Sequence, residues 1–307
     1  MAVAVPHKYE VSPTTFQLTG HSGCITAISG SNTHFVSCSD IGEIFVWSYS
    51  QREIESIAEH RLCRSITSSC FANDTSVALA TGDGAAILDL STCQAKHIRE
   101  RGAERGVVSN CICTVKDSVV ALCSDSGRLS LIDLRAKHET KSVKFRVPLT
   151  GVASTASSIF VGGADGLIYS LDQRQLTRDF CCGKHDDIVC CIAANELAQL
   201  TSIGMDSKLK VWSTKPFAME DRLQCHTLIE YNPERFLLKC CWGPNHTVVV
   251  GNCAGDVTMF DSVSGLKVFQ RKRLHSAVVT SIAHLRGNSS AWVLSGSMDK
   301  TVVAQAV

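Results

Sequence analysis

The chain is organised by a repeat of about 43 residues, and this repeat limits its possible folds more than any other feature. Seven times, a short apolar run that contains Ser or Gly is followed by a polar turn and then by an alternating apolar run. The seven segments are 36–47, 79–89, 122–133, 161–172, 201–212, 250–261 and 294–305. A unit of this kind buries its apolar faces only against its neighbours, so we expect one domain over residues 1–307.

Each repeat is predicted to consist of short β-strands. Apolar and polar residues alternate in segments such as Asp165–Leu171 and Lys208–Trp212, and no segment keeps a helical period. A period of this length with several strands per unit is typical of a four-stranded blade of a β-propeller. We therefore expect an all-β, seven-bladed propeller.

The two ends of the chain are predicted to share one blade. The last repeat stops at Val307, just after its third strand, while Thr14–Leu18 has the pattern of a strand that precedes the first repeat. We expect this N-terminal strand to complete the seventh blade, because ring closure removes an exposed sheet edge.

Composition narrows the possible functions. The chain has 30 Lys and Arg against 29 Asp and Glu, a formal net charge of +1, which is not that of a basic nucleic-acid coat. Four Trp and four Tyr provide no aromatic ladder for single-stranded bases. Pro6 and His7 interrupt the apolar stretch that a signal peptide needs, and no run approaches the roughly 18 apolar residues of a membrane span. We expect a soluble, intracellular protein with no membrane partner.

The 16 cysteines are scattered through apolar runs, as expected of reduced core residues in an intracellular protein. Adjacent cysteines such as Cys190 and Cys191 point to opposite faces of a strand, and the chain has no Cys-x-x-Cys pair. Gly-rich phosphate-binding loops are also absent from the sequence. We expect no metal and no cofactor.

Several repeats carry a His before the first strand, an Asp in the turn and a Trp at the end, as in His185, Asp206 and Trp212. These are signature positions of the WD-repeat family, which the chain resembles over essentially its full length. The resemblance implies that a His, a Ser or Thr, an Asp and a Trp of one blade form a hydrogen-bonded network. The residues to which it assigns this structural role are His21, Trp47, His185, Ser202, Asp206, Trp212, His275, Ser295 and Asp299.

A Ser, a His and an Asp in one repeat could also be a hydrolase triad, which needs a nucleophile beside a base that a carboxylate orients. The set recurs from repeat to repeat, and no Gly-x-Ser-x-Gly elbow is present in a strand-to-helix context. A buried structural network is the favoured interpretation, and we expect no enzymatic activity.

Two repeats end in Asp-x-Arg, at Asp133–Arg135 and Asp172–Arg174. These tripeptides resemble the box by which many WD-repeat proteins dock to the adaptor of cullin-type ubiquitin ligases. An Arg at the rim of a blade can form charge-assisted contacts, so Arg135 and Arg174 are candidate partner-binding residues. The compact basic triplet Arg271–Arg273 is either a solvated loop or a contact to an acidic partner or an RNA phosphate.

Repeats three to six have a narrower resemblance. The segments 205–218, 220–222 and 237–244 are similar to the fifth and sixth repeats of WD-repeat subunits of the spliceosomal U5 small nuclear ribonucleoprotein. The resemblance implies a nuclear, non-catalytic, non-homo-oligomeric scaffold in pre-mRNA splicing that binds the large U5 scaffold protein and other splicing factors, with mainly indirect RNA association. It makes Pro216, Phe217 and Arg222, in the longest insertion, candidate partner-binding residues. A substrate receptor of a ubiquitin ligase and a generic WD-repeat adaptor are the alternatives.

Overall fold

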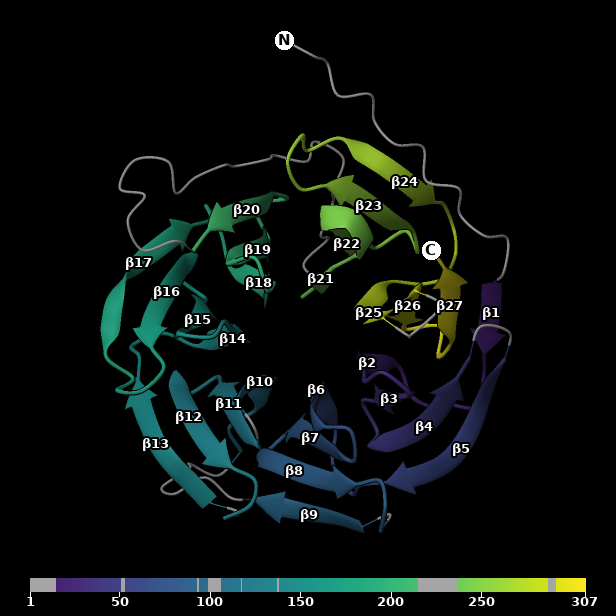
Figure 1. Cartoon of the computed structure of the whole chain (residues 1–307), viewed down its shortest axis with the longest axis horizontal. Coiled ribbons are helices and arrows are strands. Elements are labelled where there is room, and N and C mark those ends of the chain that lie inside the picture. The colour runs from purple at the N-terminus through teal and green to yellow at the C-terminus, as the bar shows by residue number, and fades with distance from the viewer. Residues whose placement is uncertain are drawn as a thin grey trace.

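The computed structural model describes residues 15–50, 53–92, 94–98, 106–116, 118–136, 138–214, 237–286 and 291–307. These residues form seven antiparallel sheets arranged in a ring, a seven-bladed β-propeller (Figure 1). Within this part of the chain, the helical structure is limited to the short 3-10 turn η1 (Pro244–His246). The prediction of an all-β propeller is confirmed.

In blades 1 to 6, each sheet is a meander in which the first strand in sequence lies innermost (Figure 1). Blade 1 contains β2 (Ile25–Gly30), β3 (His34–Ser39), β4 (Glu43–Tyr49) and β5 (Ile54–Arg61). Blade 2 contains β6 (Ile66–Asn73), β7 (Ser76–Thr81), β8 (Gly84–Asp89) and β9 (Gln94–Ile98). Blade 3 contains β10 (Ser109–Lys116), β11 (Val119–Ser124), β12 (Arg128–Asp133) and β13 (His138–Lys144).

The second half of the ring repeats this plan. Blade 4 contains β14 (Leu149–Ser154), β15 (Ser158–Gly163), β16 (Leu167–Asp172) and β17 (Arg178–Lys184). Blade 5 has three strands among the described residues, β18 (Val189–Ala194), β19 (Gln199–Gly204) and β20 (Leu209–Ser213). Blade 6 contains β21 (Cys240–Trp242), β22 (Thr247–Gly251), β23 (Val257–Asp261) and β24 (Lys267–Arg271).

Blade 7 joins the two ends of the chain. Its inner strands are β25 (Val279–Arg286), β26 (Ala291–Ser297) and β27 (Val302–Ala306), and its outer strand is the N-terminal β1 (Thr15–Leu18). β1 pairs antiparallel with β27, with Thr15 opposite Gln305 and Leu18 opposite Val302. The N-terminal strand therefore completes the seventh blade as predicted, and β27 has no exposed edge.

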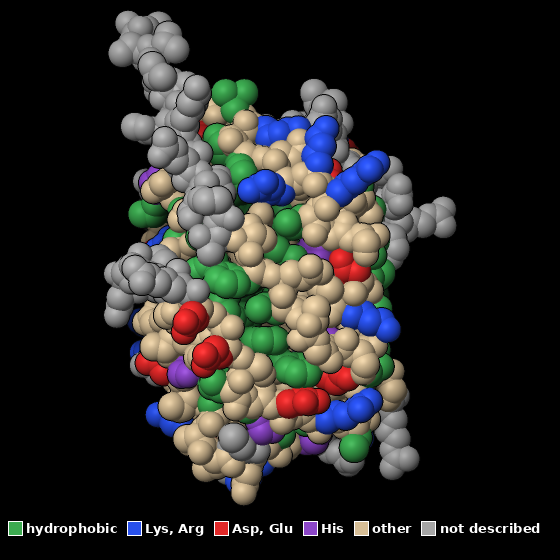
Figure 2. Space-filling model, turned by 90° about the vertical axis from the view of Figure 1, so that its right-hand side faces the viewer, with side chains coloured by type: hydrophobic (Ala, Val, Ile, Leu, Met, Phe, Trp, Pro, Cys, Tyr) green, Lys and Arg blue, Asp and Glu red, His purple; other side chains and the backbone are tan. Residues whose placement is uncertain are grey.

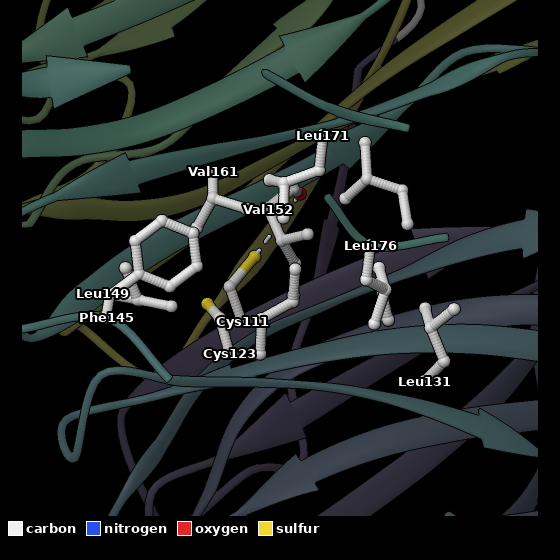
Figure 3. Close-up of a cluster of buried hydrophobic side chains, with 12 residues drawn as sticks. Cys111, Cys123, Leu131, Phe145, Leu149, Val152, Val161, Leu171 and Leu176 are labelled. Atoms are coloured by element: carbon white, nitrogen blue, oxygen red, sulfur yellow. Dashed lines mark hydrogen bonds between the residues drawn. The ribbon is translucent and has the colours of Figure 1, made fainter. Parts of the chain in front are cut away.

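The hydrophobic core lies between neighbouring blades. Figure 3 shows one such cluster, in which Cys111 and Cys123 of blade 3 face Leu149, Val152 and residues of the following strands of blade 4. The strand residues alternate, so each blade sends apolar side chains to both of its neighbours. Each fully buried aliphatic side chain contributes about 1.5 to 3 kcal/mol, and the buried thiols fill space as small apolar groups.

A ring of side-chain hydrogen bonds also links the innermost strands. In five of the seven blades, the side chain of the second residue of the innermost strand donates a hydrogen bond to a backbone carbonyl in the innermost strand of the next blade. The pairs are Thr26 to Ile66, Thr67 to Ser109, Asn110 to Leu149, Thr150 to Val189 and, across the closure, Thr280 to Ile25. A neutral hydrogen bond of this kind contributes about 1 kcal/mol and fixes the register between blades.

The antiparallel meander places alternate turns on opposite faces of the disc. The face that carries the blade-to-blade loops and the second-to-third turns holds His21, His185 and His275, and we call it the histidine face. The face that carries the first-to-second and third-to-fourth turns holds Arg135 and Arg174, and we call it the Asp-x-Arg face.

The closure of blade 7 can be tested at Phe16, whose ring lies 5.7 Å from the ring of Trp292. We expect Phe16→Ala to lower the free energy of unfolding by about 2 kcal/mol, because the partly buried ring leaves a gap over Trp292. Thr15→Ala, at an exposed position of the same strand, should change it by less than about 0.5 kcal/mol. Urea denaturation measures both, and equal effects would contradict a packing role for β1.

Candidate functional site

The four signature residues of blade 5 lie together. His185 Nε2 is 2.7 Å from Ser202 Oγ, and Trp212 Nε1 donates to the same oxygen over 2.8 Å. Since an indole N–H only donates, the Ser202 hydroxyl accepts from Trp212 and donates its own proton to His185 Nε2. His185 Nδ1 then carries the ring proton and donates to Asp206 Oδ1 over 2.9 Å.

Charge in this network resides on the carboxylate. Burial lowers the pKa of His185, more strongly than its contacts with Asp206 raise it, so the ring is neutral at neutral pH. Burial acts to raise the pKa of Asp206, but hydrogen bonds from the Asp186 backbone and from His185 hold it below its ordinary value. Ser202 is 0% exposed, so its hydroxyl has no access to a substrate in this structure. The network therefore connects the loop that enters blade 5 to the strands of that blade.

Blade 7 has the same arrangement with one member changed. His275 Nε2 is 2.9 Å from Ser295 Oγ, and His275 Nδ1 is 3.1 Å from Asp299 Oδ2. Gln305 occupies the position of the Trp, and its side-chain nitrogen has no hydrogen-bond partner in the described part of the chain. The network of blade 7 therefore lacks the hydrogen bond that Trp212 donates in blade 5.

Blade 1 uses a glutamate that the sequence pattern did not single out. His21 and Trp47 both bond to Ser37 Oγ, at 2.7 and 2.9 Å, and His21 Nδ1 lies 3.4 Å from Glu43 Oε2. The turn residue Asp40, which the repeat pattern would favour, instead accepts from the Cys24 backbone N–H.

Glu43 is held ionised although it is buried. Burial acts to raise the pKa of its carboxyl, but hydrogen bonds from the Ser22 hydroxyl and from the backbone N–H groups of Gly23 and Ser22 together lower that pKa to about 2. The carboxylate thereby fixes the loop that enters blade 1.

The two predicted arginines lie on the Asp-x-Arg face and are both exposed. Arg135 pairs with the carboxylate of its own tripeptide, with Nη2 at 3.3 Å from Asp133 Oδ2. The Arg174 backbone N–H donates to Asp172 Oδ1 over 2.8 Å, and its carbonyl accepts from the Lys141 ammonium. Among the described residues, no ion pair is formed by the Arg174 guanidinium.

A hollow of about 800 Å³ opens at the centre of the Asp-x-Arg face. It is lined by the ends of innermost strands and by their first-to-second turns, which come from six blades, and by Thr214, which follows the third strand of blade 5. Its walls include Trp242, His284 and Thr214. No single repeat contains this site, so no motif within one repeat predicts it.

The polar groups of the hollow are largely held within the protein. Trp242 Nε1 donates to the Ala193 carbonyl over 3.0 Å, and the Ser154 and Thr214 hydroxyls donate to backbone carbonyls. Burial lowers the pKa of His284 to about 4, so its ring is neutral, and its Nε2 has no partner within the described residues. The exposed side chains of Glu196 and Arg286 also line the hollow, so its wall offers one charge of each sign beside the indole of Trp242.

Exposed apolar side chains also occur on this face. Leu197 lies in the first-to-second turn of blade 5, and Val263 and Leu266 lie in the third-to-fourth turn of blade 6, with exposures of 56, 66 and 60%. Large apolar side chains that are exposed on one face favour a protein-binding surface there.

Pro216, Phe217 and Arg222 lie outside the described residues. Thr214, which is close to them in sequence and precedes the insertion, lines the hollow of the Asp-x-Arg face.

Comparison with known protein families found no matching family, and no curated protein matched the chain. Within the described residues, no cluster of three or more His, Cys, Asp or Glu side chains could hold a metal ion. No helix of this part of the chain is both long and apolar enough to cross a membrane. The seven-bladed propeller is consistent with a WD-repeat protein, and its class is that of a protein-interaction scaffold or adaptor.

The difference between blades 5 and 7 gives a stability test. Ser202→Ala leaves the buried Trp212 N–H without an acceptor, so we expect the free energy of unfolding to fall by about 2 to 3 kcal/mol. Ser295→Ala takes a partner from His275 and a 3.4 Å contact from the Val303 carbonyl, but it strands no buried indole N–H, and we expect a loss of about 1 kcal/mol. Urea denaturation of the two variants measures the difference, and equal losses would show that the Trp does not depend on the serine.

The carboxylate of Glu43 makes stability depend on pH. Its pKa is about 2 in the fold against an ordinary value of 4.5, so its contribution is complete above about pH 4.5 and is lost as the pH falls toward 2. We expect Glu43→Gln to cost about 3 kcal/mol at neutral pH and progressively less below about pH 4.5. Denaturation curves of both proteins at several pH values test this. A difference that stays constant down to about pH 3 would contradict it.

Proposed function

We propose that the protein is a non-catalytic scaffold of the U5 small nuclear ribonucleoprotein that acts in pre-mRNA splicing and binds the large U5 scaffold protein through its Asp-x-Arg face. The protein would then work in the nucleus, and its association with RNA would be mainly indirect.

The observation that carries the proposal is the composition of this face. It brings together the hollow of about 800 Å³, the exposed side chains of Leu197, Val263 and Leu266, and the two Asp-x-Arg arginines. A rigid ring that presents such groups can bind a partner without a large cost for ordering its own surface.

The splicing role is supported by the sequence segments that resemble the forty-kilodalton WD-repeat subunit of the U5 particle. One of these segments, 205–218, contains Thr214, and another, 237–244, contains Trp242. Both residues line the hollow. Two of the three segments that carry the resemblance thus contribute residues to the surface to which we assign partner binding.

A substrate receptor of a cullin-type ubiquitin ligase is the second candidate. It is favoured by Arg174, whose guanidinium is exposed and forms no ion pair within the described part of the chain. A ligase adaptor with an acidic group at the matching position could form a charge-assisted contact with this arginine.

Purification of the tagged protein from its native cells, with mass spectrometry and sequencing of the bound RNA, separates the two candidates. We expect U5 RNA together with the large U5 scaffold protein. The ligase assignment would replace the splicing assignment if a cullin and its adaptor were recovered without small nuclear RNA. Loss of that cullin and adaptor in Arg174→Ala would then assign the contact to Arg174.

The role of the Asp-x-Arg face is tested by charging its apolar positions. We expect Leu197→Glu combined with Val263→Glu to reduce co-purification of the partner by roughly tenfold or more, because buried carboxylates would be left unpaired in the interface. Ile57→Glu is the matched control, since Ile57 is 53% exposed on the outer strand β5. Normal recovery with the double variant would contradict the assignment of this face.

The insertion is tested separately. Replacement of residues 216–222 by a Gly/Ser linker of equal length should abolish co-purification of the same partner if Pro216, Phe217 and Arg222 contribute to binding. Unchanged association would remove the insertion from the interface and leave the rest of the face to be tested.

A further inference from the structure

Three consecutive basic residues, Arg271–Arg273, end β24 and begin the loop to blade 7 on the histidine face. All three are exposed. Figure 2 shows Lys and Arg side chains gathered at the upper end of this side of the molecule, the end at which β24 lies in Figure 1. Within the described residues, no ion pair neutralises the triplet.

Asp256 lies next to the triplet, but its oxygens are engaged by neutral donors. Its Oδ1 accepts from the Arg273 backbone N–H over 2.7 Å, and its Oδ2 accepts from the side-chain amides of Asn252 and Gln270 over 3.2 and 3.4 Å. The carboxylate orders the loop and leaves the guanidinium groups to face solvent.

Asp299 is the other carboxylate at this position. It accepts from the backbone N–H groups of Ser276 and Thr301, over 2.9 and 3.0 Å, and from the Thr301 hydroxyl over 2.7 Å. It also bonds to His275 as described above. Its hydrogen-bonding capacity is therefore largely used inside blade 7.

A cavity of about 520 Å³ lies beside the triplet, between the loop from blade 6 and the outer strand β1 of blade 7. Its walls include Arg273, Ser276 and Gln17, and also Asp299, whose oxygens are engaged by the donors named above. Arg273 adopts a left-handed backbone conformation with φ of +50°, and Asp256 holds its N–H. The loop is thus shaped so that one basic residue belongs both to the triplet and to the cavity wall.

We propose that this cavity binds the phosphate group of a phosphorylated serine or threonine in a partner protein. The phosphate has three acceptor oxygens and a charge of about −1.5 to −2 at neutral pH. A guanidinium can donate two parallel hydrogen bonds to it, and the Gln17 amide and the Ser276 hydroxyl are further donors in the wall.

The compact form of the site favours one phosphate over a nucleic-acid backbone. Binding of an RNA strand needs a basic groove along successive phosphates and aromatic side chains for the bases. Here the cations are concentrated in one triplet, and Phe269, the nearby aromatic ring, lies 6.0 Å below the Arg271 guanidinium. The inference goes beyond the proposed function, because the site lies on the opposite face from the hollow.

The test is a titration of the isotopically labelled protein with a short peptide that has one phosphoserine flanked by glycines. We expect the backbone NMR signals of Arg273, Ser276 and Gln17 to shift together. Arg273→Gln and Lys272→Gln should each weaken binding, the former by roughly tenfold or more because it loses charge-assisted hydrogen bonds. Lys96→Gln, at an exposed position of β9 in blade 2, is the control and should bind like the unchanged protein.

Three results would overturn the inference. The first is equal binding of the unphosphorylated peptide or of a peptide with Glu in place of phosphoserine. The second is tighter binding of a short polyuridine oligonucleotide that displaces the phosphopeptide. The third is the absence of shifts at these residues, or shifts that persist in a folded Arg273→Gln variant. None of these results depends on whether the protein copurifies with U5 RNA.

Discussion

The ring of hydrogen bonds between innermost strands is the constraint on which the rest of the structure depends. In five of the seven blades, a short donor at the second position of the innermost strand fixes the blade to the next, as Thr280 does across the closure to Ile25. In blade 5 this residue is Cys190, and in blade 6 the short strand β21 has Cys241 as its second residue. At the seam between blades 5 and 6, Trp242 donates to Ala193 near the Asp-x-Arg face. The side chain that helps to join this seam also forms a wall of the hollow.

The repeat spacing predicted the large-scale architecture because every blade obeys the same geometric rule. Seven units, their strands and the shared blade 7 follow from period and alternation alone. Glu43 was missed for a local reason: it lies four residues before Trp47, whereas Asp206 lies six before Trp212. The longer side chain of Glu43 reaches His21, the histidine equivalent to His185, and the loop that enters blade 1. A different acidic residue at a different spacing therefore fixes the loop of this blade.

The hollow could not be predicted in the same way. Its walls combine residues from six blades, and each of them is ordinary within its own repeat. His284 is one strand residue among many in the sequence, and only the closed ring places it beside Trp242. Arg135 and Arg174, in contrast, were visible in the sequence because each lies beside its own Asp in a short turn. Local motifs could therefore be predicted from the sequence, whereas the surface that the closed ring assembles could not.

The two faces differ in chemistry for a physical reason. On the histidine face, the carboxylates of Glu43, Asp206 and Asp299 are engaged with loops and histidines, so the exposed charge at the seam of blades 6 and 7 is that of the basic triplet. The Asp-x-Arg face offers a hollow lined by both Glu196 and Arg286, and exposed apolar side chains in its turns. Since the core between the blades is closely packed, a ligand on one face has little means to alter the other. A propeller of this kind can bind two partners of different chemistry at once, with nearly additive free energies.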